Sequence, residues 1–594
     1  MTEKNDTYYQ WKNRIDIGLA FQKKWKQDFR VEELDAYWEG FQRPASWTGE
    51  FIPINLIYAN VKSQLDGLSW NPSFSVRPAR THIPAPSNLQ MLDMQAQLRE
   101  NTLNYFLSEC NAKAELKKCT LDAYPHFGVA KICYKPFHKP HPQAGKGITS
   151  GGYPIMNEEG EEEVYPENEL IDEKFYISRR NPSDILLDPY ADSIENIKWV
   201  AERISYTPEE FENEPLFNNT SGVDAHNILS PSEQSPEELR KRPDGFVARI
   251  TTGGNSSLAG NKDTSFEEVI YVWEIYDIVN RKIFCIVDNT NRIVREDNFP
   301  EWLEEHPYAF LYFNLRRNSA YPIPELYPQL GPQDEYNITR NQIITHRKRF
   351  NRKYEVREGT ISDNELSKFE DPYDGLVIKT QTDGMAIRPI IEPSLDQAVY
   401  FDVEMLRKDF MDISGDSIPD SDIAKIEKTG VASLLNQRMQ NRKSGKLAAV
   451  QEFIQQLGKK MMLLIEHELT LPVAIAINGP TGQAWQGINP DDFTRGLGEF
   501  SYEIAVGSLI PRDPDSERSS WIALLQFIDM NPNIGQSPLL LTKTAKMFGV
   551  EDKSLIQEIV NFALASQQQQ MMQGGQPGQP SMSGDMAKTL GMGG

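Results

Sequence analysis

Residues 329–351 read QLGPQDEYNITRNQIITHRKRFN, and residues 394–413 read SLDQAVYFDVEMLRKDFMDI. Both segments predict a helix. In the earlier segment, Pro332 suits the first helical position, and the basic run 346–349 suits the negative end of the helix dipole. The later segment opens with a capping box that starts at Ser394. We therefore expect an outgoing helix over 329–351 and a returning helix over 394–413.

The 352–393 stretch between these helices predicts a compact excursion of short elements. The expected elements are a strand at 354–357, a helix near 363–369 and a strand at 375–379. Gly415 ends the returning helix. The order is therefore helix, short excursion, helix.

The outgoing helix carries an unusually narrow apolar stripe. Its members are seven residues apart, which leaves little surface for the core of a monomer and suits packing beside copies of the same helix. The apolar residues of the returning helix recur at helical spacing. The expected subunit interface consists of Tyr336, Ile343, Phe350, Val399, Val403, Leu406 and Phe410.

Length and charge restrict the class of protein. A chain of 594 residues exceeds one ordinary hydrophobic core, so several domains are expected. A formal net charge of −23 argues against a surface that binds nucleic acid all over, but it allows local contact. We expect no signal peptide and no membrane-spanning run. The four cysteines have no metal-binding or redox spacing, so reduced thiols are expected.

Motifs of catalysis are missing from the sequence. The Gly-rich stretch 253–262 lacks the Gly-Lys-Ser/Thr pattern of a phosphate-binding loop. We find no paired-histidine zinc helix and no nucleophile elbow. The expectation is a protein that is not an enzyme and that needs no metal or cofactor.

The segments before residue 329 mix helices and strands. Helices are expected at 7–40, with Asp6 as cap, and at 89–123. The nine carboxylates between Glu158 and Glu173 are expected to form a solvated loop rather than a cation site. Residues 212–264 suggest a loop-rich insertion. Strands are expected at 74–78, 129–134, 199–205, 267–277 and 281–287.

Several short motifs lie along this order of elements. They are Gly40-Phe41-Gln42 after Trp38, an Asn55-led helix, Asn71-Pro72, Asn181-Pro182, Thr207-Pro208-Glu209-Glu210 and Thr429-Gly430-Val431-Ala432 before a long helix. With the central helix–excursion–helix stretch, this order resembles the portal proteins of tailed bacteriophages, most closely the short-tailed-phage type. The resemblance covers most of residues 35–565.

The resemblance implies an α+β, mainly helical fold with a wing, a stem, a clip and a crown. The implied divisions are N-terminal helices and wing 1–328, outgoing stem helix 329–351, clip 352–393, returning stem helix 394–413, tunnel segment 414–445, long helix and return to the wing 446–511, crown helices 512–566 and a disordered tail 567–594.

The resemblance also implies a function. Portal proteins form a ring, usually of twelve subunits, at one capsid vertex, and the genome is packaged and ejected through its channel. The implied partners are double-stranded DNA without base readout, the terminase large subunit, a tail adaptor, and the major capsid and scaffolding proteins. The implied location is the virion, after synthesis in the host cytoplasm. The alternative is another head–tail connector or virion structural protein without a DNA channel.

Two groups of basic residues are candidates for DNA contact. The stem and clip group consists of Arg340, Arg347, Lys348, Arg349, Arg352, Lys353 and Arg357. The tunnel group consists of Lys425, Lys428, Arg438, Arg442, Lys443 and Lys446. A lysine or arginine can follow phosphates without reading bases. The alternative for both groups is pairing with acidic residues of the same or a neighbouring chain.

Overall fold

The computed structural model describes most of residues 2–504. Outside the description lie Met1, 45, 49, 67–71, 82–87, 143, 145, 147–148, 151–152, 155–167, 224, 230–265, 288–289, 291, 350–352, 371–377, 381–384, 391–396, 416–428, 480–481, 494–497 and nearly all of 505–594. The expected crown helices and tail, and much of the expected insertion, therefore lie outside the described residues.

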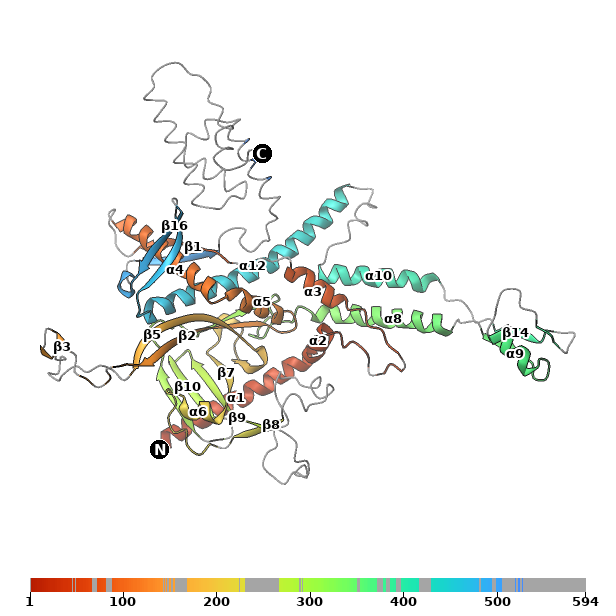
Figure 1. Ribbon diagram of the computed structural model, residues 1–594, viewed down its shortest axis with the longest axis horizontal. Coiled ribbons are helices and arrows are strands. Elements are labelled where there is room, and N and C mark those ends of the chain that lie inside the picture. Colours follow the sequence, from red (N-terminus) through yellow and green to blue (C-terminus); the bar gives the residue numbers. More distant parts are fainter. Residues whose placement is uncertain are drawn as a thin grey trace, which may run out of the picture. The chain divides into compact units, whose positions relative to one another are not determined.

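The chain divides into two compact units. The large unit comprises residues 1–32, 62–325 and 444–594, and the small unit comprises residues 33–61 and 326–443. Both units contain helices and strands (Figure 1). The chain is therefore α+β, as expected from its sequence.

Antiparallel sheets make up much of the large unit. One sheet has the strand order β11-β10-β9-β7-β6, with β8 paired to β9, and a second has the order β12-β2-β5. Their bounds are β2 Gly128–Pro140, β5 Asn168–Arg180, β6 Ile185–Leu187, β7 Trp199–Tyr206, β8 His226–Leu229, β9 Phe266–Asp277, β10 Lys282–Val287, β11 Ile293–Asn298 and β12 Tyr308–Leu311. The strands expected at 199–205, 267–277 and 281–287 are confirmed.

Three smaller sheets are pairs of strands in the large unit. They are β1 (Phe74–Thr81) with β17 (Gly498–Ile504), β3 (Thr149–Ser150) with β4 (Tyr153–Pro154), and β15 (Val473–Gly479) with β16 (Gly482–Ile488). Strand β1 contains the strand expected at 74–78. Its pairing with β17 joins parts of the chain that are more than 400 residues apart.

The two long helices expected in the N-terminal part are each divided in two. Helices α1 (Thr2–Asp28) and α2 (Val31–Trp38) are separated at Arg30, where φ is 51°. Helices α4 (Asn88–Glu109) and α5 (Ala112–Asp122) are separated at Asn111, where φ is 50°. One left-handed residue turns the chain out of a right-handed helix. The expectation of single helices was wrong, and Asp6 lies inside α1 rather than capping it.

The chain also contains the following helices and 3-10 turns. They are α3 (Leu56–Asp66), α6 (Pro208–Asn213), α12 (Thr429–Glu468) and the 3-10 turns η1 (Pro182–Asp184), η2 (Ile194–Asn196), η4 (Tyr327–Gln329) and η5 (Pro490–Asp492). Helix α6 begins with a capping box between Thr207 and Glu210.

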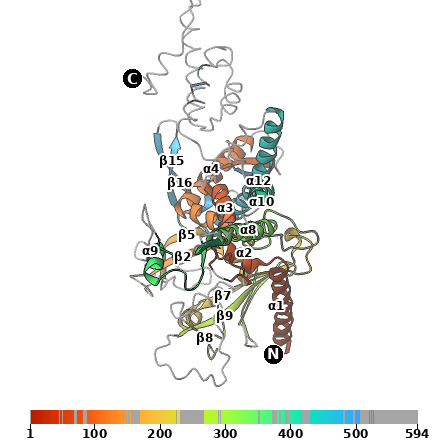
Figure 2. The ribbon, with the colours of Figure 1, turned by 90° about the vertical axis from the view of Figure 1, so that its right-hand side faces the viewer.

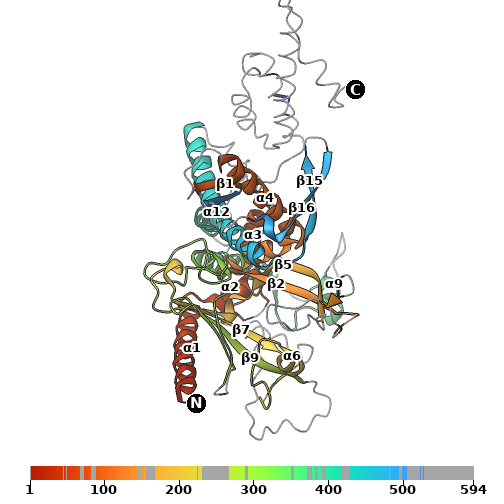
Figure 3. The same cartoon turned by 90° about the vertical axis from the view of Figure 1, so that its left-hand side faces the viewer.

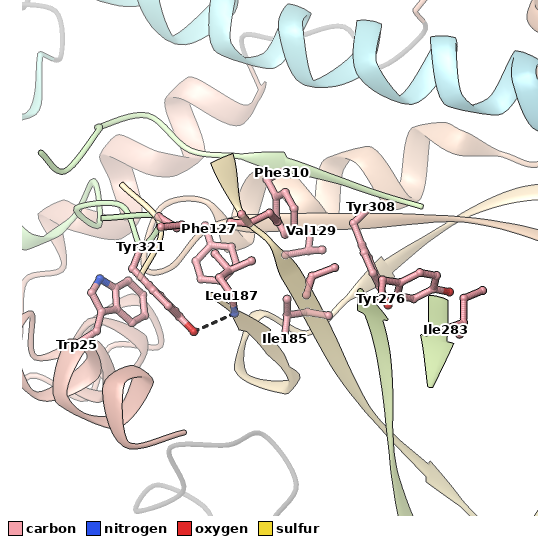
Figure 4. Close-up of a cluster of buried hydrophobic side chains, with 14 of the residues drawn as sticks. Trp25, Phe127, Val129, Ile185, Leu187, Tyr276, Ile283, Tyr308, Phe310 and Tyr321 are labelled. Atoms are coloured by element: carbon pink, nitrogen blue, oxygen red, sulfur yellow. Dashed lines mark hydrogen bonds between the residues drawn. The ribbon is translucent and has the colours of Figure 1, made fainter. Parts of the chain in front are cut away.

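Aromatic side chains dominate the core of the large unit (Figure 4). Trp25, Phe127 and Tyr321 pack together there, and each is almost fully buried. Their polar atoms are satisfied: the Trp25 indole donates to the Pro322 carbonyl at 2.8 Å, and the Tyr321 hydroxyl accepts from the Leu187 N–H at 3.2 Å. Because the polar atoms of Trp25 and Tyr321 are hydrogen-bonded, burying these side chains does not carry the free-energy cost of an unpaired polar group.

Helix α1 packs on the larger sheet. Trp11 and Ile15 are buried against Trp199 of β7 and Trp273 of β9. Figures 2 and 3 show α1 running beside these strands.

The small unit contains the predicted helix, short excursion and helix of residues 329–413. Its elements are α8 (Leu330–Arg349), β13 (Lys353–Val356), α9 (Asp363–Glu370), β14 (Ile387–Ile390) and α10 (Gln397–Ser414). Strand β13 pairs antiparallel with β14, which the sequence did not predict. The strand expected at 375–379 lies mostly outside the described residues, and Ile378 and Lys379 are not in a strand. The order of helix, short excursion and helix is confirmed.

Candidate functional site

Helices α8 and α10 lie side by side in the small unit (Figure 1). Helix α10 also contacts η4, directly before α8, so the chain leaves along one helix and returns along the other. Leu406 and Phe410 of α10 are buried, and Val399 and Val403 are half-buried. The excursion with β13, α9 and β14 connects the two helices.

This packing corrects the predicted subunit interface. Tyr336 and Ile343 of α8 are also buried within the single chain, so the narrow stripe does not need a second copy to cover it. What the sequence missed is that polar side chains complete the buried side of α8. Phe350 lies outside the described residues.

Three amide side chains on α8 form a ladder with an extended segment. Gln333, Asn337 and Asn341 are at most 1% exposed. The backbone N–H of Leu56 donates to the Gln333 Oε1 atom at 2.9 Å, that of Ile54 to the Asn337 Oδ1 atom at 2.9 Å, and that of Ile52 to the Asn341 Oδ1 atom at 2.8 Å. The ladder therefore attaches segment 52–56 to the helix through its backbone.

The spacing of this ladder follows from the two backbone geometries. Four residues of α-helix rise about 6 Å, and two residues of extended chain span about 6.6 Å. Amides four apart on α8 can therefore meet every second residue of segment 52–56. Gln333 and Asn341 also donate to the carbonyls of Ile54 and Ile52, at 2.8 and 2.9 Å. The sequence analysis missed these residues, although their spacing of four was visible.

The short motif around Gln42 joins the same network. Gln42 is buried, its Oε1 atom accepts from the Asn337 Nδ2 atom at 2.6 Å, and its own amide donates to the Tyr37 carbonyl at 3.0 Å. Gly40 has φ 94°, a conformation that favours glycine. The Tyr37 hydroxyl donates to Asp334 of α8. Segment 37–56 is therefore held against α8 largely by polar contacts.

The side of α10 away from its buried residues carries exposed apolar side chains among charged ones such as Glu404 and Lys408. Tyr400, Phe401 and Met405 are 52%, 69% and 58% exposed. Phe401 and Met405 are four residues apart and so share one side of the helix. Isolated exposed apolar residues are common, but three within six residues of one helix form a patch suited to contact with another protein surface.

The stem and clip group of basic residues is only partly exposed. Arg347, Lys353 and Arg357 are exposed. Lys348 pairs with Glu50, and its hydrogen bond lowers the pKa of that carboxyl. Arg340 is half-buried, and its Nε atom has no hydrogen-bond partner within the described part of the chain. The side chain of Arg349 and all of Arg352 lie outside the described residues.

The tunnel group requires two corrections. Helix α12 begins at Thr429, so the expected tunnel segment 414–445 is helical over 429–445. The Lys446 ammonium lies 2.6 Å from the Glu325 carboxylate and donates to Gln64 at 2.9 Å. Lys446 is therefore held in an internal ion pair, and we remove it from the DNA-facing candidates.

For the other tunnel residues, DNA contact remains a prediction. Lys425 and Lys428 lie outside the described residues. Arg438, Arg442 and Lys443 lie on α12, but their side chains lie outside the description.

A buried charge network lies between the two sheets of the large unit. The Lys131 ammonium is 2.8 Å from Glu202 and also contacts Glu274. Burial opposes the charge, but the two carboxylates outweigh it and raise the pKa of Lys131. The Tyr308 hydroxyl donates to Glu202 at 2.7 Å. Because its members satisfy one another, we assign the network a structural role.

Metal and thiol chemistry find no support in the described part of the chain. No group of three or more His, Cys, Asp or Glu there could hold a metal ion. Burial raises the pKa of all four cysteine thiols, which disfavours the reactive thiolate. Among the described helices, none is long and apolar enough to cross a membrane.

Comparison with known proteins gives no match: no protein-family model matches the chain, and no curated protein sequence matches it.

Proposed function

We propose that the chain is the portal protein of a tailed bacteriophage. In this proposal it forms a ring at one capsid vertex, and double-stranded DNA passes through the channel of the ring during packaging and ejection. The terminase large subunit, a tail adaptor, and the capsid and scaffolding proteins would dock on it. The proposal rests on the resemblance of the sequence together with the geometry of the small unit.

The observation that carries the proposal is the pair α8 and α10 with the short excursion between them. Two packed helices joined by a paired strand element and a short helix match the expected stem and clip. The ladder of Gln333, Asn337 and Asn341 supports the proposal further, because it attaches segment 52–56 to α8 and so stiffens the outgoing helix.

The charge of the chain is consistent with a sliding channel. Each phosphate that a protein neutralises adds a salt-dependent attraction, so a channel that must release DNA is better mostly acidic. A net charge of −23 per chain supplies that background. In this proposal, DNA contact is confined to a few exposed cations, such as Arg347, Lys353 and Arg357 near the excursion.

A packaging experiment tests the proposal. Capsids of the parent virus would be assembled with and without this chain, and the nuclease-protected DNA in each would be measured. We expect filled capsids only when the chain is present. Equal amounts of protected DNA in capsids without it would exclude the portal function.

A further inference from the structure

A cavity of about 490 Å³ opens on the large unit between α1 and the turns at the ends of β6, β7 and β9. Its lining includes Arg14 and Ile17 of α1, Tyr190 and Lys198 beside β7, and Val279 after β9. Neither the fold nor the proposed function uses this cavity.

The acidic residues of the cavity are already engaged. Asp188 accepts from the backbone N–H of Tyr190 at 3.0 Å and from that of Lys198 at 3.3 Å. Asp277 accepts from the backbone and side-chain amides of Asn280 at 3.2 and 2.7 Å. Both carboxylates are buried and support turns, so they are poorly placed to attract a cation.

The basic residues of the cavity are not engaged in this way. Arg14 and Lys198 are exposed, and neither side chain has a hydrogen bond or ion pair among the residues that the structure describes. The Arg14 guanidinium only stacks on the Trp11 ring, 4.4 Å from its centre. In a chain with 85 acidic residues, two neighbouring cations without acidic partners favour an anionic ligand.

Apolar side chains stand at the same opening. Tyr190 is 81% exposed and Val279 is 67% exposed. A small inorganic anion would leave both in water, whereas an acidic peptide with apolar residues would cover them while its carboxylates met Arg14 and Lys198. The chemistry therefore fits a peptide better than a free anion.

We propose that this cavity binds the acidic run 157–169 of a second copy of the chain. That run has the sequence NEEGEEEVYPENE, which contains seven glutamates, no basic residue, and the apolar pair Val164 and Tyr165. Its carboxylates suit Arg14 and Lys198, and its apolar pair suits Tyr190 and Val279. The inference requires a second copy beside the first, which the proposed ring would supply, but it requires no DNA channel.

The geometry of β5 favours a second copy over the same chain. The acidic run ends in the first two residues of β5, Asn168 and Glu169, and the cavity residue Asp188 follows eight residues after Arg180, where β5 ends. Thirteen residues of strand span about 40 Å. The run of the same chain therefore starts at the far end of β5, whereas a neighbouring copy has no such restriction.

Disulfide trapping between two full-length variants tests the contact. One variant carries Val279→Cys and the other carries Val164→Cys, and their mixture is oxidised mildly and analysed on a non-reducing gel. Because a bound segment has a high effective concentration, we expect at least about tenfold more covalent heterodimer than in a control mixture with Lys24→Cys in place of Val279→Cys. Lys24 is exposed on α1, outside the cavity lining.

Charge reversal provides the second arm. Arg14→Glu with Lys198→Glu in the Val279→Cys chain should remove the excess heterodimer. The control is Lys23→Glu with Lys24→Glu, which makes the same charge change on exposed positions of α1 and should leave the excess unchanged. An excess that is absent, or one that survives the Arg14 and Lys198 reversal, overturns the inference. Short duplex DNA and a glutamate peptide, added at the same concentration of charge, distinguish a phosphate site from a peptide site. If the DNA suppresses the excess heterodimer and the peptide does not, the cavity binds phosphate and the inference is overturned.

Electron micrographs of the same samples separate this inference from the proposed function. Rings without trapped heterodimer would contradict the cavity contact alone. Trapped heterodimer without rings would contradict the ring while leaving the contact in place.

Discussion

The Asn337 Oδ1 atom on α8 accepts a hydrogen bond of 2.9 Å from the backbone N–H of Ile54, although the two residues lie 283 positions apart in the chain. It thereby satisfies a half-buried backbone donor that has no strand partner beside it. The same amide donates to Gln42 at 2.6 Å. Asn337 is therefore the centre of the polar ladder that holds segment 52–56 on the outgoing helix.

Replacing Asn337 with alanine should destabilise the small unit. The change leaves the Ile54 N–H and the Gln42 oxygen without these partners in a buried setting, which should cost about 3 kcal/mol. Urea unfolding followed by a probe in the small unit measures this cost. Gln342→Ala, an exposed amide on the same helix, is the control and should change stability by less than about 0.5 kcal/mol. Equal effects of the two changes would mean that the ladder contributes little.

The exposed face of α10 should mediate assembly. Phe401→Asp with Met405→Asp places charges on residues that are 69% and 58% exposed, so the chain should fold normally but fail to form rings. Native mass spectrometry reports the subunit number, and circular dichroism checks the fold. Glu404→Gln, an exposed change between the two positions, should leave assembly intact.

The contrasting variant is Leu406→Asp, which buries a charge inside the α8–α10 pair and should reduce folding itself. Intact rings of the Phe401 and Met405 variant would show that this face is not the subunit interface. Loss of rings only with Leu406→Asp would be explained by misfolding.

Stability in mild acid should depend on Glu173. Burial opposes its charge, but hydrogen bonds from Thr470, Leu471 and Tyr134 outweigh burial and lower the pKa of this carboxyl below its usual 4.5. Because the folded-state pKa is the lower one, the stabilisation is fully present above pH 4.5 and is lost as pH falls through the folded-state pKa.

Glu173→Gln should therefore destabilise the protein by about 2 kcal/mol at pH 7, and the difference from the unmodified chain should shrink below pH 4.5. Melting temperatures from pH 3 to pH 8 measure both effects. Glu268→Gln, an exposed change on β9, is the control. A difference that stays constant down to pH 3 would exclude the charged carboxylate as the cause.

The tunnel lysines should affect DNA rather than assembly. Lys425→Glu with Lys428→Glu should leave rings intact and reduce packaged or retained DNA, because reversing two charges turns local attraction for phosphate into repulsion. Packaging assays on capsids with the variant measure this. Lys135→Glu with Lys139→Glu, on exposed positions of β2, is the charge-matched control. Normal packaging with the Lys425 and Lys428 variant would show that these lysines do not contact DNA.

Much of the fold could be predicted because its signals are local. The period of apolar residues indicated α8, α10 and α12, and alternation indicated β7, β9 and β10. The capping box at Thr207 gave the start of α6. Breaks such as the one at Arg30 carry no comparable signal, because arginine rarely adopts a positive φ.

Less of the candidate site could be predicted, because its contacts join distant parts of the chain. Gln333 and Asn341 are polar, so the apolar stripe of the helix does not include them, whereas the structure buries them against segment 52–56. Lys446 looked like a free cation until Glu325, 121 residues earlier, was found beside it. The exposed pair Phe401 and Met405 could be recognised only after the structure showed which face of α10 was covered.

Electron microscopy of the purified full-length chain tests the central claim most directly. The account predicts closed rings with a central channel, with α8 and α10 of each copy packed beside those of its neighbours. Monomers, open filaments or closed particles without a channel would contradict it.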